Sequence, residues 1–169
     1  MYRRTTREIP LASAPPAVAE ALARHCADHQ LTLDPARCRA WHTHSENPEA
    51  AGFFGKLLGR RANPADPDAE HDSVLVLHPT HVVLATTGKA RGSVAMSLPL
   101  LQASVRRGSA LPAHLAARVP GASEGITLSG FPGHVGRPGE YFFGLGEGPA
   151  AQRCATAVEA AVAAAKAGG

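Results

Sequence analysis

The segment SVLVLHPTHVVLATTG, residues 73–88, carries the clearest structural signal in the sequence. Two runs rich in valine and leucine lie on either side of the tetrapeptide HPTH, and runs of this composition are typical of β-strands. The tetrapeptide contains Pro79, whose ring fixes φ at a value that suits a turn. The segment therefore predicts a β-hairpin, from which the rest of the fold can be worked outward.

The strand pattern continues on the C-terminal side of this hairpin. The residues GKARG, 88–92, predict the next turn. Further strands are expected in SVAMSLPL (93–100), LQASVRR (101–107), GITLSGF (125–131) and GEYFFGLG (139–146). In the first of these, Val94, Met96 and Leu98 share one face, because strand side chains alternate between faces.

An alanine-rich helix is expected over residues 149–167. Pro149 suits its first turn, and two glycines, Gly168 and Gly169, follow its last. The apolar positions recur at helical spacing and predict an inward face, which consists of Ala151, Ala155, Val158, Val162 and Ala165. Small side chains on this face suit close approach to a curved sheet.

On the N-terminal side, the sequence predicts one helix and one strand. Residues 14–30 carry prolines in the first turn and apolar side chains at a spacing of four, which favours a helix. The strictly alternating residues 37–45, RCRAWHTHS, predict a strand. Residues 1–12 are expected to form a flexible segment ahead of a single domain, 13–169.

A long insertion is expected after that strand. Asn47 is a helix-capping residue and Pro48 suits the first helical position, so residues 47–61 predict a helix. Residues 62–72 contain acidic side chains two positions apart, without the glycine and the final glutamate that a calcium-binding EF-hand loop requires. We therefore expect a solvated acidic linker there.

Composition limits the classes of function. The net charge is +3, and no arginine stripe with interleaved aromatic residues is present, so we expect no nucleic-acid partner. The three cysteines are odd in number and widely spaced, as free thiols in a reducing compartment are. Neither a secretory signal nor a run of 18 apolar residues is found, and we expect a cytoplasmic protein.

The succession of strands from DSVLVLHPTHVVLATTG to GEYFFGLG, followed directly by a helix, resembles the pleckstrin-homology-like (PH-like) superfamily over residues 37–167. The resemblance implies a mostly β, α+β fold: a seven-stranded antiparallel split barrel with a C-terminal capping helix. The N-terminal helix and the helical insertion after the first strand would be additions to it. PH-like domains bind phosphoinositides or protein segments and have no catalytic residues of their own.

The segment GFFGKLLGRRANP, residues 52–64, lies where the resemblance places a ligand loop. It would offer Lys56, Arg60 and Arg61 to the phosphates of an anionic membrane surface, with Phe53 and Phe54 in the lipid interface. The same apolar side chains, with Ala50, Leu57 and Leu58, form one helical stripe. That stripe could instead pack on the domain itself or contact a partner protein.

Histidines and cysteines raise a zinc alternative. His25 and His29 share a helix face, while His42 and His44 share a strand face with Cys38. If the helix packs on the strand, a mixed histidine and cysteine site could form, although neither spacing matches a zinc finger.

Catalytic motifs are weak. GASEG, residues 121–125, matches the nucleophile-elbow pattern but precedes a strand pattern, whereas an elbow leads from a strand into a helix. TTGK, residues 86–89, lacks the earlier glycine of a phosphate-binding P-loop. We therefore expect a non-enzymatic binding module without a cofactor. Its function would be protein–protein interaction or self-assembly, through a sheet edge or the 50–61 stripe, with anionic-lipid binding as the alternative.

Overall fold

The computed structural model describes residues 3–48, 66–109, 124–133 and 138–169. The first sheet has five antiparallel strands in the order β1-β2-β3-β4-β5: Arg3–Ile9, Arg39–Glu46, Glu70–Leu77, His81–Gly88 and Gly92–Pro99. The second sheet has three antiparallel strands, β6 Ser104–Arg107, β7 Gly125–Phe131 and β8 Gly139–Gly144. The helical elements are η1 Leu11–Ser13, α1 Pro16–Asp28 and α4 Pro149–Ala167.

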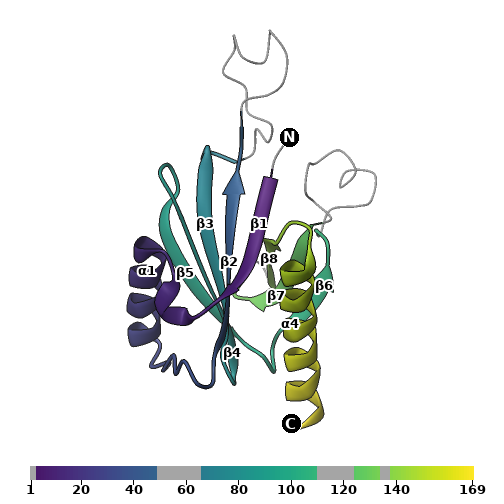
Figure 1. Ribbon diagram of the computed structural model, residues 1–169. Helices are drawn as coiled ribbons and strands as arrows, with labels where there is room; N and C mark the ends of the chain where they lie inside the picture. The colour runs from purple at the N-terminus through teal and green to yellow at the C-terminus, as the bar shows by residue number, and fades with distance from the viewer. Residues whose placement is uncertain (1–2, 49–65, 110–123, 134–137) are drawn as a thin grey trace.

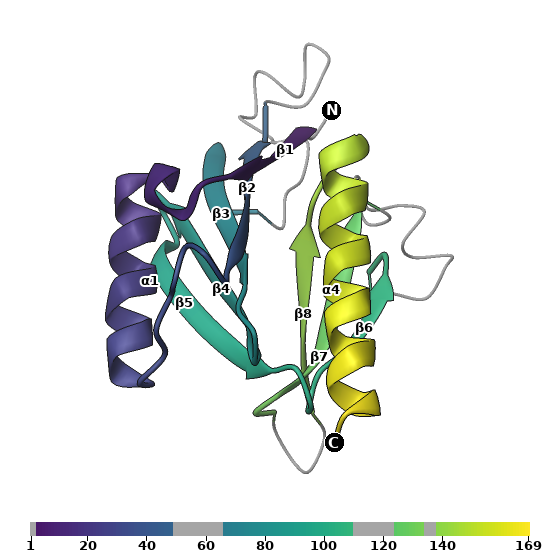
Figure 2. The ribbon, with the colours of Figure 1, turned by 60° about the horizontal axis from the view of Figure 1, so that its bottom comes forward.

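The elements are arranged in layers around the five-stranded sheet (Figures 1 and 2). Helix α1 packs on β4 and β5 and covers what we call the outer face. The three-stranded sheet and α4 lie against the opposite, inner face. Because both faces are covered, the strands β3 and β4 are apolar on both sides, and each reads as a nearly continuous run of valine and leucine.

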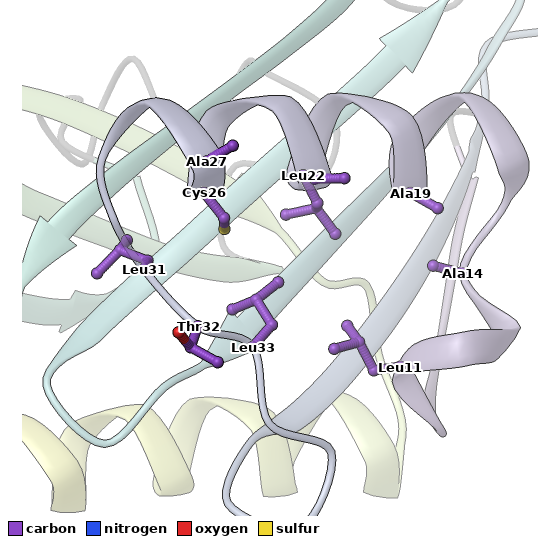
Figure 3. Close-up of a pocket in the computed structure, with 10 residues that line it drawn as sticks. Leu11, Ala14, Ala19, Leu22, Cys26, Ala27, Leu31, Thr32 and Leu33 are labelled. Carbon is purple, nitrogen blue, oxygen red and sulfur yellow. The ribbon is translucent and has the colours of Figure 1, made fainter.

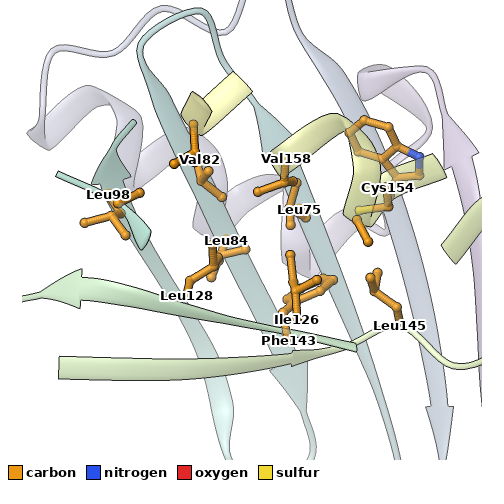
Figure 4. Packing of buried hydrophobic residues seen from close by; sticks show 14 of the residues in the cluster. Leu75, Val82, Leu84, Leu98, Ile126, Leu128, Phe143, Leu145, Cys154 and Val158 are labelled. Atoms are coloured by element: carbon orange, nitrogen blue, oxygen red, sulfur yellow. The ribbon is translucent and has the colours of Figure 1, made fainter. Parts of the chain in front are cut away.

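The larger core fills the inner face (Figure 4). Trp41, Leu75 and Leu84 from the first sheet meet Ile126 and Phe143 from the second, and all are almost inaccessible to solvent. Helix α4 completes this core with the buried side chains of Ala151, Cys154, Ala155, Val158 and Val162. The predicted inward face of α4 is thus confirmed for four of its residues, and Ala165 is partly buried against the same core.

A smaller core lies under α1 on the outer face. Val18, Leu22 and Cys26, spaced by four along the helix, pack with the buried residues Val74 and Val83 of the sheet. The helix predicted over 14–30 is confirmed as Pro16–Asp28, with its prolines at the N-terminus. Propensity and periodicity agree here, since proline is tolerated only in the first turn.

The N-terminal segment differs from the sequence-based expectation. Residues 3–9, expected to lie in a flexible segment, form β1, which pairs with β2 from Arg3↔Glu46 to Ile9↔Ala40. The Thr6 hydroxyl contacts the Thr43 hydroxyl at 2.7 Å and also donates to the Leu145 carbonyl. RRTTREI has little apolar periodicity, so pairing with β2 determines the strand and the local sequence does not.

The predicted mostly β, α+β class is confirmed, but the barrel is wrong. Residues 37–167 contain seven described strands, β2 to β8, as predicted, and β1 is an eighth strand ahead of them; the two sheets that these strands form are not closed into a barrel. Strand β8 crosses the inner face: Tyr141 lies against Thr86 of β4, whereas Leu145, just after β8, reaches Thr6 of β1. Side-chain packing, and not strand pairing, therefore joins the two sheets.

Candidate functional site

Strand β5 forms one edge of the five-stranded sheet. Among the described strands it pairs with β4 only, in the register His81↔Pro99 to Gly88↔Gly92. Figure 2 shows β5 as the last strand of the sheet, with α1 beside it. The N-terminal half of β5 is exposed, and the side chain of Val94 has 51% of its surface accessible.

The hydrogen-bond register shows which backbone groups of β5 are left unpaired by the described strands. The Leu100 N–H donates to the Thr80 carbonyl at 2.9 Å, one step beyond the last residue pair of the ladder. Hydrogen-bonded and non-hydrogen-bonded pairs alternate in an antiparallel ladder, so Val94 and Met96 also bond to β4. The N–H and C=O groups of Ser93, Ala95 and Ser97 therefore point away from the sheet, toward the open edge.

A pocket of about 230 Å³ lies beside this edge on the inner face. Its walls are Val94 and Met96 of β5, Leu84 and Thr86 of β4, and Tyr141 of β8, and we call it the Tyr141 pocket. The lining is mostly apolar, with hydroxyl groups at one side. The Tyr141 hydroxyl lies 3.3 Å from Thr86 Oγ1, which in turn lies 2.9 Å from Ser73 Oγ.

Arg91 holds the turn between β4 and β5. Its Nε donates to Asp68 at 2.6 Å, its Nη2 donates to Asp66, and the Ala90 N–H donates to Asp68 at 2.5 Å. Burial opposes ionisation of Asp68, but the Ala90 amide and the Arg91 guanidinium together hold its pKa below the usual value. Burial likewise opposes the charge on Arg91, but the two carboxylates raise its pKa. This network fixes the end of the hairpin that presents β5.

The network corrects the prediction of a solvated acidic linker. Asp66 and Asp68 are buried, and Glu70 and Asp72 belong to β3. Gly88 permits this packing, because a Cβ atom at position 88 would lie 2.6 Å from Asp68 Cγ. No local feature of the sequence connects Asp66 and Asp68 to Arg91, which lies more than twenty residues further along the chain.

A second polar cluster lies on the outer face. His42 Nε2 is 2.7 Å from Asp72 Oδ1, His44 Nδ1 is 3.0 Å from the same oxygen, and Arg7 Nε donates to His42 Nδ1 at 3.3 Å. Burial opposes ionisation of Asp72, but hydrogen bonds from the two histidines lower its pKa. Both imidazoles are thus engaged by a carboxylate, which orients them.

The structure separates the residues of the predicted zinc site. His25 and His29 stack on each other with ring centroids 4.0 Å apart, and His25 Nε2 lies 3.0 Å from Ser97 Oγ. His42 and His44 share Asp72 instead, and Cys38 precedes β2. Within the residues described, no group of three or more His, Cys, Asp or Glu side chains is arranged to hold a metal ion.

An apolar pocket of about 470 Å³ lies between α1 and the segment 31–33 (Figure 3). Leucines and alanines from η1, α1 and this segment form its walls, and Thr32 and Cys26 supply the remaining lining. The pocket contains no charged side chain, so only an apolar group could be buried in it without a desolvation penalty.

The predicted lipid-binding residues Lys56, Arg60, Arg61, Phe53 and Phe54 lie outside the described residues, as do most of GASEG and all of the helix predicted over residues 47–61 except Asn47 and Pro48. TTGK ends β4 and enters the β4–β5 turn, as the sequence predicts. No described helix combines the length and the apolar character needed to cross a membrane.

The sequence placed Val94 and Met96 on one face of a strand, and the structure adds Tyr141 and Arg91 to the same site.

In comparisons with known proteins, no protein-family model, curated protein or solved structure matches this chain.

Proposed function

We propose that this protein is a non-catalytic binding module that adds an extended segment of a partner protein as a further strand along β5. The observation that carries the proposal is the edge of β5 that no described strand occupies, with its outward backbone groups beside the Tyr141 pocket. An added strand would bond to Ser93, Ala95 and Ser97. Its side chains would then alternate between the two faces of the sheet.

The pocket gives this mode of binding a source of specificity. Backbone hydrogen bonds are independent of sequence, so recognition depends on the side chains that the added strand directs inward. These side chains would lie next to Val94 and Met96 and enter the Tyr141 pocket, which favours apolar residues. The outward side chains would face the small residues Ser93, Ala95 and Ser97, so the expected ligand alternates apolar and small or polar residues.

The edge also lacks most of the features that protect free strands. Natural edge strands are commonly blocked by lysine, by inward-pointing charges, by bulges or by proline. Of these protective features, β5 has only a proline, Pro99, at its C-terminal end. The PH-like resemblance implies non-catalytic binding of phosphoinositides or protein segments, and the second of these agrees with the proposal.

A peptide-display selection tests this function. A library of random ten-residue peptides is panned against the wild-type protein, and selected peptides are synthesised and titrated by calorimetry. We expect Val94→Lys, which places a charge at the pocket, to weaken binding by about tenfold or more. Leu101→Lys is the matched control, because Leu101 is a comparably exposed apolar residue (60% accessible, against 51% for Val94) outside β5.

Amide hydrogen exchange then locates the bound peptide. The N–H groups of Ser93, Ala95 and Ser97 should exchange more slowly in the complex, whereas those of Val94 and Met96, already bonded to β4, should change little. The proposal fails if the selected peptides bind Val94→Lys as tightly as the wild type, or leave the three edge amides unprotected.

A further inference from the structure

We infer that one occupant of the β5 edge is β5 of a second copy of this chain, paired antiparallel about a two-fold axis through Ala95. The inference rests on the proposed strand addition and names a partner for it. In this register Ala95 pairs with Ala95 of the partner, Ser93 with Ser97, and Val94 with Met96. A closed, isologous dimer with a continuous ten-stranded sheet would result.

The backbone pattern of β5 suits this register. Ser93, Ala95 and Ser97 each direct one donor and one acceptor to the open edge. Because these positions are symmetric about Ala95, each group faces a complementary group of the other copy, and about six hydrogen bonds would join the strands. Pro99 has no N–H group to donate. In this register it lies opposite Arg91 of the second copy, beyond the last of these hydrogen bonds, so none of them is lost.

The side chains of the edge are also self-complementary. On the inner face, Val94 of one copy would lie opposite Met96 of the other in both halves of the interface. The Tyr141 pocket, which these two residues line, would then receive the apolar side chains of the partner strand. The half-exposed Val94 would become buried, which accounts for a large apolar side chain at an open sheet edge.

Helix α1 lies at a suitable distance from the axis. It packs on β4 and β5, and neighbouring strands are about 4.8 Å apart. A helix above the β4–β5 pair is therefore about 5 Å from an axis that lies half a strand spacing beyond β5. The two copies of α1 would run antiparallel about 10 Å apart, the separation at which helices pack.

The side of α1 that faces the axis carries complementary charges. His25 of α1 contacts Ser97 of β5, so this side of the helix lies over β5. The exposed residues Ala17, Glu20, Arg24 and Asp28 follow on that side at helical spacing. Glu20 and Arg24 pair with each other at 3.6 Å within one helix, and in an antiparallel arrangement each can pair with its opposite in the second copy. The small side chain of Ala17 allows the two copies of α1 to approach closely.

Sedimentation equilibrium over about 2–200 µM protein tests the dimer. We expect concentration-dependent dimers for the wild type and for the Leu101→Lys control. Val94→Lys should raise the dissociation constant at least tenfold. Glu20→Arg and Arg24→Glu should each weaken the dimer, and the double variant should recover most of the loss because the charges are exchanged. Circular dichroism checks that each variant is folded.

Cross-linking tests the register. Val94→Cys/Met96→Cys should form a disulfide-linked dimer on mild oxidation, since paired cysteines on non-hydrogen-bonded positions fall within bridging distance. Neither single variant nor the wild type should do so. A wild type that stays monomeric up to 200 µM overturns this inference, and a dimer that tolerates Val94→Lys or does not cross-link overturns it as well. If monomers still bind the selected peptides along β5, the proposed function stands without the dimer.

Discussion

Arg91 shows how single residues hold this fold together at a distance in sequence. Its guanidinium bonds to Asp66 and Asp68, two carboxylates that are almost wholly buried. His71 Nδ1 also lies 3.2 Å from Asp66. Buried charges are tolerated only when they are paired and hydrogen-bonded, so each member of the cluster depends on the others.

Removing the guanidinium should therefore be costly. We expect Arg91→Ala to lower the free energy of unfolding by about 3–5 kcal/mol, since it removes the guanidinium to which both buried carboxylates bond. Arg106→Ala is the control, because Arg106 is half-exposed and, among the described residues, makes one ion pair, with Glu140 at 3.8 Å. It should cost about 1 kcal/mol or less. Urea denaturation measures both, and equal effects of the two substitutions would contradict the assigned role.

The three free cysteines should differ in reactivity. Burial raises the pKa of the Cys154 thiol to about 12 and also raises the pKa values of Cys26 and Cys38. At pH 8 only about one Cys154 in ten thousand would be the reactive thiolate, and its side chain is inaccessible. Iodoacetamide should label the half-buried Cys38 first and Cys154 last in the folded protein, as read by peptide mass spectrometry. In guanidinium the three cysteines should be labelled at similar rates, because the protein is unfolded. Rapid labelling of Cys154 in the folded protein would contradict the packing of α4.

At the scale of elements, the strands and the terminal helix are largely predictable because each has a consistent local pattern. The apolar runs of β3 and β4, the alternation in β2 and β5, and the capped, alanine-rich α4 were all recognised within a few residues of their bounds. Strand β1 was missed because pairing with β2, and not its own composition, makes it a strand. Helix α1 was predicted, but its position over β4 and β5 was not, since nothing local directs it there.

The contact between α1 and the sheet makes stability depend on pH. Burial lowers the pKa of His25 and of His81, and nearby histidines lower both further. A histidine whose pKa is lower in the folded state binds protons more readily when unfolded, so stability falls as pH drops below the unfolded value of about 6.5. Asp28, on the same helix, opposes the shift of His25. His42 and His44, which are close to a carboxylate, belong to a different cluster.

The double variant His25→Gln/His81→Gln isolates this effect. Between pH 7.5 and pH 5.5 the wild type should lose more free energy of unfolding than the variant, because the variant lacks the two histidines that resist protonation. Guanidinium denaturation at both pH values measures the difference. The carboxylates Asp68 and Asp72 titrate well below this range, since their pKa values are lowered. If the wild type and the variant lose the same free energy of unfolding, these two histidines do not cause the pH dependence.

At the scale of the whole molecule, the central sheet is covered on both faces and open along β5. The inner face meets the second sheet and α4, and the outer face meets α1, so β1 and β5, each paired on one side only among the described strands, are the two edges of the sheet. Strand β1, at the other edge, is tied to the second sheet through Thr6 and Leu145 and contacts α4. This asymmetry between two edges of one sheet favours β5 over β1 as the proposed site of strand addition.

The sequence alone determined most of the described strands and helices, with β1 as the exception, because periodicity, proline position and β-branched content act over a few residues. It also indicated that Val94 and Met96 share a face. Only the tertiary structure decided that the sheets stay separate, that Asp66 and Asp68 are buried against Arg91, and that Tyr141 forms a pocket beside the open edge. These features depend on contacts between residues far apart in the chain, and no short-range pattern encodes such contacts.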